Sequence, residues 1–227
     1  MAHPLDRPAW NALTSRHAAI AEGNALAKRY PPTITLFAAA RDASAESQAA
    51  LAALLRPGEM MWLADAGPIV VPDGLTAIET ESAVQLILTK TPARVSDPRI
   101  TRLTEADAAE MLALAVLTRP GPFTLRAQAL GEFFGIRIDG RLAAMAGTRM
   151  MQDGYAEVSG VCTHPDFQRQ GLARLLSVFM VHRFLDRGET PYLHAYAANT
   201  SAISLYESIG FEKRTVLNVM VVGRDAA

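Results

Sequence analysis

One segment of the chain, residues 161–174, combines residue types that bind phosphate groups. It reads as the end of a strand, a short loop, and a glycine, Gly171, that opens a long helix. The first turn of a helix has unpaired N–H groups and the positive end of the helix dipole, so it is a natural phosphate site. Gly171 and Ala173 leave room for a group lying on the backbone, and Arg169 and Arg174 add positive charge. Such junctions often carry a small residue for packing alone, so spacing by itself leaves both interpretations open.

A second group of candidate residues, Asn199, Ala202 and Tyr206, follows about 30 residues later. Their spacing of i, i+3 and i+7 places them on one face of a helix. The hydroxyl of Tyr206 can donate a proton in catalysis, or Tyr206 can be a core residue that packs beside Phe211. The spacing does not decide between these two roles.

Together, the two groups resemble the cofactor-binding signature of the GNAT family of N-acetyltransferases. Gln168-x-x-Gly171-x-Ala173 is similar to the family pattern Q/R-x-x-G-x-G/A, and it lies after an expected strand and at a helix start. The run V-C-T-H-P-x-F before it and the run N-x-x-A-x-x-x-Y-x-x-x-G-F after it resemble the family as well. The resemblance covers about residues 100–222, and residues 1–95 lie outside it.

The resemblance implies that acetyl-CoA is the cosubstrate and that no metal is needed. In such proteins the strand before the signature pairs with the pantetheine arm, and the amides of the loop hold the pyrophosphate. The residues expected to bind acetyl-CoA are Val161, Cys162, Thr163, Gln168, Arg169, Gln170, Gly171, Leu172, Ala173, Arg174, Asn199 and Tyr206.

The resemblance also implies two catalytic roles. Tyr206 would protonate the leaving thiolate, and a base must take a proton from the ammonium before its nitrogen attacks. Glu157 is the first candidate base, because strand alternation places Glu157, Ser159 and Val161 on one face, with Cys162 on the other. Some GNAT enzymes have a catalytic glutamate at that spacing, whereas others deprotonate the amine through water. Glu157 is also typical of a half-exposed strand glutamate, so these alternatives stay open.

The acceptor site is expected in residues 118–126, between the first helix of the matched region and the following hairpin. Arg119 and Arg126 could pair with a carboxylate of the acceptor, and Phe123 would lie beside them. Surface arginines on a loop are an equally good interpretation. The segment favours a small amine or an amino-acid-like acceptor.

These groups need a mixed sheet to position them. Thr104 and Asp107 form a variant capping box at a helix start, and Asp139-Gly140 and Asp153-Gly154 are hairpin signals. The other expected elements are strands at 132–138, 142–150, 155–163, 192–197 and 215–222, a long helix after Gln170 that ends at Gly188, and a helix at 199–208 that ends at Gly210. The predicted class is α/β (α+β), with the GNAT fold: a mixed central sheet flanked by helices.

A linker is expected at residues 90–98, where Pro92 and Pro98 favour extended backbone. It divides the chain into a smaller N-terminal α/β subdomain (1–95), resembling a degenerate GNAT-like half, and a GNAT acetyltransferase domain (96–227). In the first part a helix is expected at 43–55, capped by Ser44, with strands at 33–39, 60–64 and 83–88.

The bulk composition excludes several classes of protein. The chain has 227 residues and a net charge of -1, which gives no argument for a nucleic-acid partner. With one cysteine, Cys162, it has no intramolecular disulfide or cysteine-based metal site. The N-terminus lacks a secretory signal, and the apolar run 111–117 is too short to span a bilayer. We therefore expect a cytoplasmic protein with no membrane partner, either a monomer or a homodimer.

The expected function is transfer of an acetyl group from acetyl-CoA to a primary amine, by direct attack in a ternary complex. A covalent route through Cys162 is disfavoured, because that residue reads as a packing residue. The alternative is a GNAT-fold module that binds acyl-CoA without turnover, as a sensor or scaffold. A ribosomal-protein or toxin-like acetylase is a third hypothesis.

Overall fold

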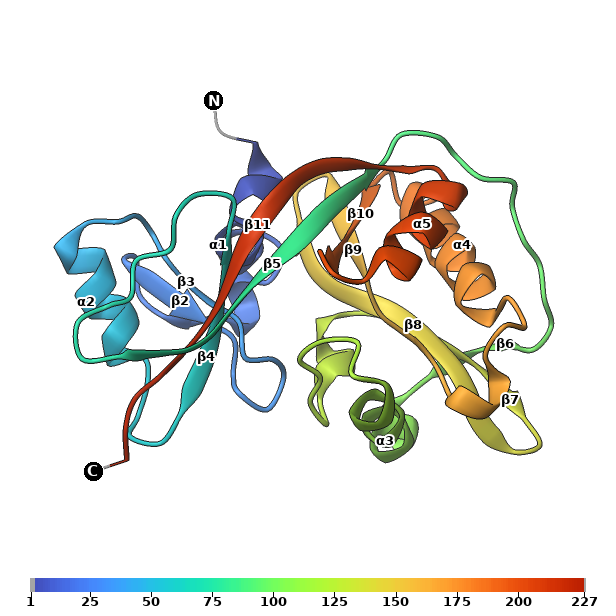
Figure 1. Cartoon of the computed structure of the whole chain (residues 1–227), viewed down its shortest axis with the longest axis horizontal. Coiled ribbons are helices and arrows are strands. Elements are labelled where there is room, and N and C mark those ends of the chain that lie inside the picture. Colours follow the sequence, from blue (N-terminus) through green and yellow to red (C-terminus); the bar gives the residue numbers. More distant parts are fainter. Residues whose placement is uncertain (1–2, 227) are drawn as a thin grey trace.

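The computed structural model describes residues 3–226 and is built around one mixed sheet (Figure 1). The strands of this sheet are β4 (Met60–Asp65), β5 (Thr76–Leu88), β6 (Ile100–Leu103), β7 (Phe133–Ile138), β8 (Arg141–Gln152), β9 (Tyr155–Thr163), β10 (Thr190–Tyr196) and β11 (Phe211–Gly223). The helices are α1 (Pro8–Thr14), α2 (Ala45–Ala53), α3 (Ala108–Thr118), α4 (Leu172–Leu185) and α5 (Thr200–Ile209). The strand order is β4-β11-β5-β10-β9-β8-β7-β6. The pair β9 and β10 is parallel, with α4 crossing between the two strands. The predicted mixed α/β class is confirmed.

The elements predicted for the C-terminal part are present near their expected positions. The capping box is formed, with the Thr104 N–H donating to the Asp107 carboxylate at 2.7 Å, and α3 follows it. The two Asp-Gly turns join β7 to β8 and β8 to β9. Helix α4 begins at Leu172 as predicted but ends before the predicted Gly188, because the last residues form a turn. In this turn the Gly188 N–H donates to the Leu185 carbonyl at 2.9 Å.

The N-terminal lobe, residues 3–75, was harder to predict. Its second sheet contains β1 (Glu22–Gly23), β2 (Ala27–Arg29) and β3 (Ala38–Ala40). The predicted helix is α2, whose first turn is capped by the Ser44 hydroxyl, and the predicted strand at 60–64 is β4. The strand predicted at 33–39 is wrong for most of its length. The N–H groups of Ile34 and Thr35 both donate to the Pro31 carbonyl, so the chain turns there. Helix α1, which starts at Pro8, was not predicted.

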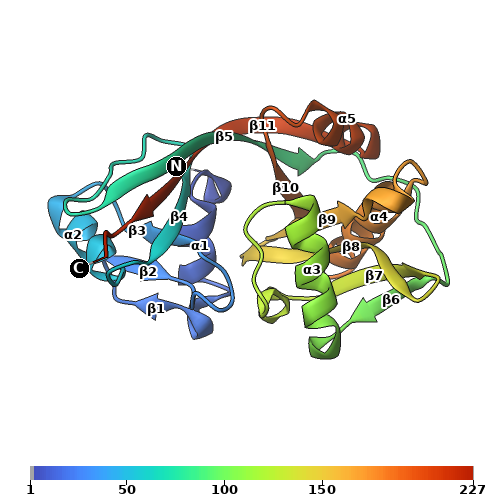
Figure 2. The same ribbon diagram turned by 60° about the horizontal axis from the view of Figure 1, so that its bottom comes forward.

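Two long strands, β5 and β11, form a ribbon that runs over both lobes (Figure 2). Their pairing extends from Leu88↔Phe211 to Thr76↔Gly223. The sequence predicted only the part of β5 from Ala83 onward, because residues 76–82 are exposed and mostly polar. Strand β5 precedes the expected linker and so belongs to the first predicted domain. In the sheet, however, it lies between β10 and β11, which belong to the second predicted domain. The division into 1–95 and 96–227 therefore stays a prediction.

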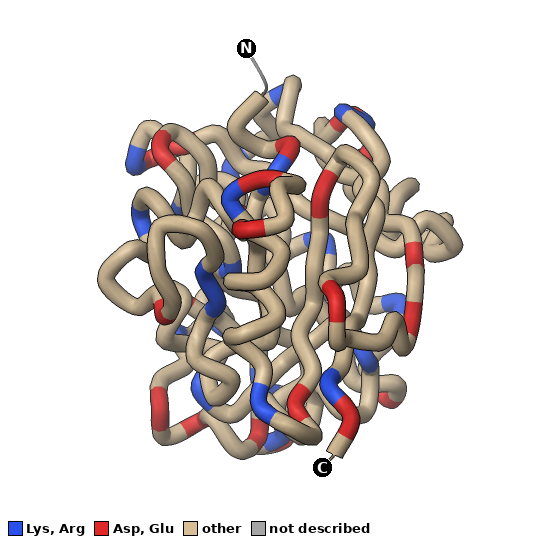
Figure 3. Tube along the Cα trace, turned by 90° about the vertical axis from the view of Figure 1, so that its left-hand side faces the viewer, with Lys and Arg blue, Asp and Glu red and all other residues tan. Residues whose placement is uncertain are grey.

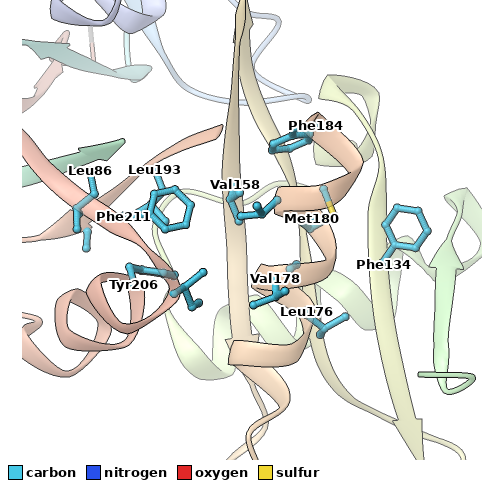
Figure 4. Packing of buried hydrophobic residues seen from close by; sticks show 14 of the residues in the cluster. Leu86, Phe134, Val158, Leu176, Val178, Met180, Phe184, Leu193, Tyr206 and Phe211 are labelled. Atoms are coloured by element: carbon cyan, nitrogen blue, oxygen red, sulfur yellow. The ribbon is translucent and has the colours of Figure 1, made fainter. Parts of the chain in front are cut away.

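Two of the four apolar clusters among the described residues are the most relevant to the site. In the first, Val158 of β9, Phe184 of α4 and Phe211 of β11 are almost fully buried (Figure 4). Full burial of a side chain of this size stabilises a fold by about 1.5–3 kcal/mol. The second cluster joins Leu5 and Phe37 of the N-terminal lobe to other residues that include Met150 and Tyr192. The two lobes therefore share a core.

Charged residues of both signs are interspersed over the side of the molecule that carries the N-terminal lobe (Figure 3). This mixture agrees with the net charge of -1. Within residues 3–226, the helices are all too short or too polar to cross a bilayer.

Candidate active site

The site begins where β9 and β10 separate. Their parallel pairing ends at Tyr192↔Glu157, and the following residues of both strands line a common pocket. Gly160 has a φ of 61°, and the register of β9 against β8 shifts near it. This bulge turns the following residues, because one extra residue reverses the alternation of side chains. Separated strands of this kind leave backbone groups for an extended ligand to pair with.

The pocket is partly open to solvent, and its lining combines apolar and charged residues. Both lobes form its walls. The N-terminal lobe contributes Pro8, Phe37, Trp62 and Ala64, the ribbon contributes Ala83, Leu217 and Val219, and the other walls include Arg119, Arg149, Val161, His194, Tyr196, Asn199 and Tyr206. Residues 1–95 thus have a defined place at the site, which their sequence did not indicate.

Tyr206 lies in the wall of this pocket on α5. Its ring packs edge-on against Phe211, with 6.1 Å between ring centroids, and its side chain is buried. Tyr206 is therefore both a core packing residue and part of the pocket wall, and its role as a proton donor stays a prediction. Burial raises the pKa of the Tyr206 hydroxyl to about 12, and nearby Cys162 adds a smaller effect in the same direction. The hydroxyl therefore keeps its proton at neutral pH.

Asn199 is the N-cap of α5. Its Oδ1 accepts a hydrogen bond from the Ala202 N–H at 3.1 Å, which satisfies one of the unpaired donors of the first turn. Asn199 and Ala202 both line the pocket, together with Tyr206 from the same helix. The predicted common face of these three residues is therefore confirmed.

The loop before α4 has the features of an anion site. Arg169 and Gly171 both have left-handed backbone conformations, with φ of 61° and 76°. Open space surrounds the position that a Cβ of Gly171 would occupy, so a ligand can approach the backbone. Gly171 is the N-cap of the 14-residue helix α4. Arg174 lies in the first turn and donates through Nη1 to the Ser208 hydroxyl at 3.1 Å. Successive exposed N–H groups in such a conformation form a concave anion-binding surface.

The other residues predicted to bind acetyl-CoA fall into two groups. Gln168 and Gln170 are exposed on the loop, whereas Leu172 is buried in the first apolar cluster. Ala173 is half-buried, and Thr163 lies at the end of β9.

Strict alternation along β9 was the wrong expectation at Val161. Val161 packs against the same apolar cluster as Ala156 and Val158, although alternation would have placed it on the opposite face. The bulge at Gly160 is the reason. Cys162 instead packs in a cluster with residues of α3. Burial raises the pKa of the Cys162 thiol to about 12, which opposes a nucleophilic role.

Glu157 is fully buried beneath the pocket, outside the set of residues that line it. Its carboxylate accepts from Arg149 through Nε at 3.0 Å and through Nη2, from the Met150 N–H at 3.2 Å, and from His194 Nδ1 at 2.6 Å. Burial alone would raise the pKa of Glu157, but the charge of Arg149 and the contact with His194 outweigh it. The pKa falls from 4.5 to about 2.

His194 is held at both ring nitrogens. Its Nε2 lies 2.9 Å from Nε2 of Gln85, and the Gln85 Oε1 accepts from Arg214 Nε. This bond to Arg214 fixes the orientation of the Gln85 amide, so the amide nitrogen donates to His194 Nε2. His194 therefore carries its proton on Nδ1 and donates it to Glu157. Sequence reasoning missed Arg149, His194 and Gln85, because each lies on a different strand and no local motif joins them.

The three predicted acceptor residues have different surroundings. Arg119 lines the pocket, with a left-handed φ of 50° after α3. Phe123 packs edge-on against Phe133 and lies in an adjoining space that we call the outer groove. The outer groove is formed chiefly by Trp62, Glu79, Glu81, Val116, Phe123 and Tyr196. Arg126 is exposed and lies in neither space, and its N–H donates to the Thr33 carbonyl of the N-terminal lobe at 3.3 Å.

Comparisons with known proteins identify the class. The profile of the FR47-like protein family matches residues 133–220. A crystal structure from Novosphingobium aromaticivorans, described as a protein of the GNAT family, is 40% identical in sequence, with a TM-score of 0.93. The match covers 99% of this chain and 100% of that one. This chain therefore belongs to the GNAT family, as its signature predicted.

The curated relatives match about a third of this chain. The Escherichia coli enzyme named ribosomal protein bS18-alanine N-acetyltransferase is 38% identical over 84 residues, which are 37% of this chain and 56% of that protein. A mycothiol acetyltransferase from Thermomonospora curvata is 37% identical over 79 residues, 34% of this chain and 27% of that protein. The chain thus spans about half the length, or less, of these curated relatives. A GCN5-related N-acetyltransferase from Kribbella flavida, at 17% identity and a TM-score of 0.62, shares the fold over 96% of this chain and 93% of its own.

Proposed function

We propose that this protein transfers an acetyl group from acetyl-CoA to a primary amine of a small acceptor. The observation that carries the proposal is the position of Tyr206, a protonated hydroxyl in the wall of the pocket where β9 and β10 separate. Acetyl-CoA would place its pyrophosphate on the loop at 168–174 and its pantetheine arm between these strands. The thioester would then lie in the pocket. The names of the relatives, which all denote acetyl transfer, support the same reaction.

The chemistry is a direct transfer within a ternary complex. The neutral amine attacks the thioester carbonyl carbon, a C–N bond forms, the attacking nitrogen releases a proton to solvent, and the C–S bond breaks. Tyr206 donates its proton to the leaving thiolate and recovers one from solvent. Because the pKa of Tyr206 is raised to about 12, its hydroxyl is protonated when the thiolate departs.

Water is the better candidate for removing the ammonium proton. A base works best with a pKa near the operating pH. The pKa of Glu157 is about 2, and its oxygens are bonded to Arg149, His194 and the Met150 N–H. These features support the alternative in which water accepts the proton. Glu157 then acts as a positioning residue that holds Arg149 and His194 in the pocket wall.

The decisive test measures thiol release from acetyl-CoA with a panel of amines and short peptides, for wild type and Tyr206→Phe. We expect the variant to lose about 100-fold or more in kcat, with the Kd for CoA unchanged by calorimetry. Tyr155→Phe makes the same change outside the pocket and should keep full activity. Absence of turnover on every acceptor, with CoA binding retained, would instead identify a non-catalytic acyl-CoA-binding module.

A further inference from the structure

We propose that Arg149, assisted by Arg119, binds a carboxylate of the acceptor. This inference rests on the proposed function and narrows its acceptor class. The acceptor would be a small molecule that carries both an amine and a carboxylate, as a free amino acid does. Sequence reasoning placed acceptor recognition on residues 118–126 alone and gave no role to Arg149.

The guanidinium of Arg149 is held by two neighbours, Glu157 and Phe37. Glu157 accepts two hydrogen bonds from one edge of it, through Nε and Nη2. The ring of Phe37 lies against its face, with 5.0 Å between Cζ and the ring centroid. The Nη1 atom points toward the loop at Gly121, 3.9 Å from the position that a Cβ would occupy there. Arg149 therefore presents a rigid fork, and a rigid fork loses little entropy when it binds an anion.

The other edge of this fork has donors to spare. A guanidinium has five N–H groups, and Glu157 takes two of them. Within residues 3–226, no acceptor is found for the remaining three. The Arg149 side chain is only 14% exposed, yet it lines the pocket. These donors are accessible from the pocket, so a planar anion can reach them, and a carboxylate matches them in two parallel bonds.

The charges around the pocket place this anion at the inner end. Glu157 neutralises Arg149, so a second positive charge is needed, and Arg119 in the same wall provides it. Arg119 also lines the outer groove, but there Glu79 and Glu81 offset its charge and would repel a carboxylate. A ligand with one carboxylate is therefore best held with that group at Arg149 and Arg119. A peptide N-terminus, whose carboxyl group is an amide, would leave these donors unused.

Arg149 also satisfies the buried charge of Glu157, so loss of activity in a variant is not enough to prove the carboxylate role. A purely structural role would reduce the turnover of all acceptors by the same factor. A carboxylate role changes the ratio between acceptors with and without that group. The readout is therefore the ratio of kcat/KM for an amino acid to kcat/KM for its amide.

The experiment uses L-alanine, L-leucine and L-phenylalanine, each beside its amide and its decarboxylated amine. Thiol release from acetyl-CoA is followed for wild type, Arg149→Lys, Arg149→Gln and Arg119→Gln. We expect wild type to favour at least one amino acid over its amide by about 10- to 100-fold, the range for one charged hydrogen bond. Arg149→Gln should bring the ratio close to one, mainly through KM. Arg149→Lys, which keeps the charge without the fork, should retain part of the preference. Arg99→Gln, on the far surface, should leave it intact.

Two outcomes overturn the carboxylate site while leaving the proposed function in place. In the first, wild type acetylates the amides or the amines as well as it acetylates the amino acids. In the second, the preference for an amino acid over its amide survives in Arg149→Gln. If no acceptor reacts at all, the proposed function fails. Calorimetry then decides the carboxylate site separately, with L-leucine and leucinamide titrated into the CoA-loaded protein. Equal binding of the two, or binding of neither, refutes it, and tighter binding of L-leucine that is lost in Arg149→Gln supports it.

Discussion

Replacement of Glu157 by Gln should lower the stability of the fold. It should also weaken the dependence of that stability on pH in the acid range. The carboxylate is buried and bonded to Arg149 and His194, and these contacts lower its pKa from 4.5 to about 2. The folded pKa lies below the unfolded value. The contribution of the ionised Glu157 carboxylate to stability is therefore complete above about pH 5 and is lost as the pH falls toward 2.

The size of this contribution follows from the two pKa values. The difference between 4.5 and about 2, at about 1.4 kcal/mol per pH unit, corresponds to about 3–4 kcal/mol of unfolding free energy. At pH 7, Glu157→Gln should cost about 3–5 kcal/mol, because it leaves the buried Arg149 guanidinium without its counter-charge.

The assay is urea unfolding followed by tryptophan fluorescence at several pH values between 7 and 3. Wild type should lose stability steeply below pH 5, and Glu157→Gln should start lower and follow a flatter curve. Glu212→Gln, an exposed change of the same type, should resemble wild type in both respects. Parallel curves for wild type and Glu157→Gln between pH 5 and 3 would refute the ion-pair account of the low pKa.

Three further predictions concern single positions. Gly171→Val should weaken acetyl-CoA binding by about tenfold or more in calorimetry, since a side chain there enters space open to the ligand and strains a φ of 76°. Gly188→Val, with a φ of 72° and equally open space beyond the other end of α4, should leave the Kd unchanged, and equal effects would remove the anion-site argument. Cys162 should resist alkylation at pH 8, because burial raises the pKa of its thiol to about 12, and rapid labelling followed by mass spectrometry would contradict this. Trp62→Ala should raise the acceptor KM severalfold without changing the Kd for CoA, whereas loss of CoA binding would show that the N-terminal lobe serves the cofactor instead.

The parts of the fold that were predictable are those with strong local signals. Two Asp-Gly turns, the Thr104 capping box and the terminating Gly210 set the limits of most C-terminal elements. These signals act within a few residues, so they can be read without knowledge of distant contacts. The signature also identified the loop around Gly171 and the tyrosine of α5.

What could not be predicted depends on contacts between distant residues. Residues 76–82 carry little apolar pattern, because they are exposed and are held in β5 by pairing with β11. The bulge at Gly160 reverses an alternation that the sequence shows as regular. The group of Glu157, Arg149, His194 and Gln85 comes from four strands. Its members meet only after the whole sheet has formed.

The ribbon of β5 and β11 also constrains how the protein folds. In the sheet, β11 lies between β4 and β5, and both of those strands belong to the first 90 residues. During synthesis, β4 and β5 must wait for more than a hundred residues before the strand between them leaves the ribosome. Pairing across so large a separation is intrinsically slow, and strand edges exposed meanwhile favour aggregation. A nascent chain stalled before residue 211 would therefore need protection of these strand edges. The wall of the pocket that contains Leu217 and Val219 is the last to be completed, because both residues lie on β11.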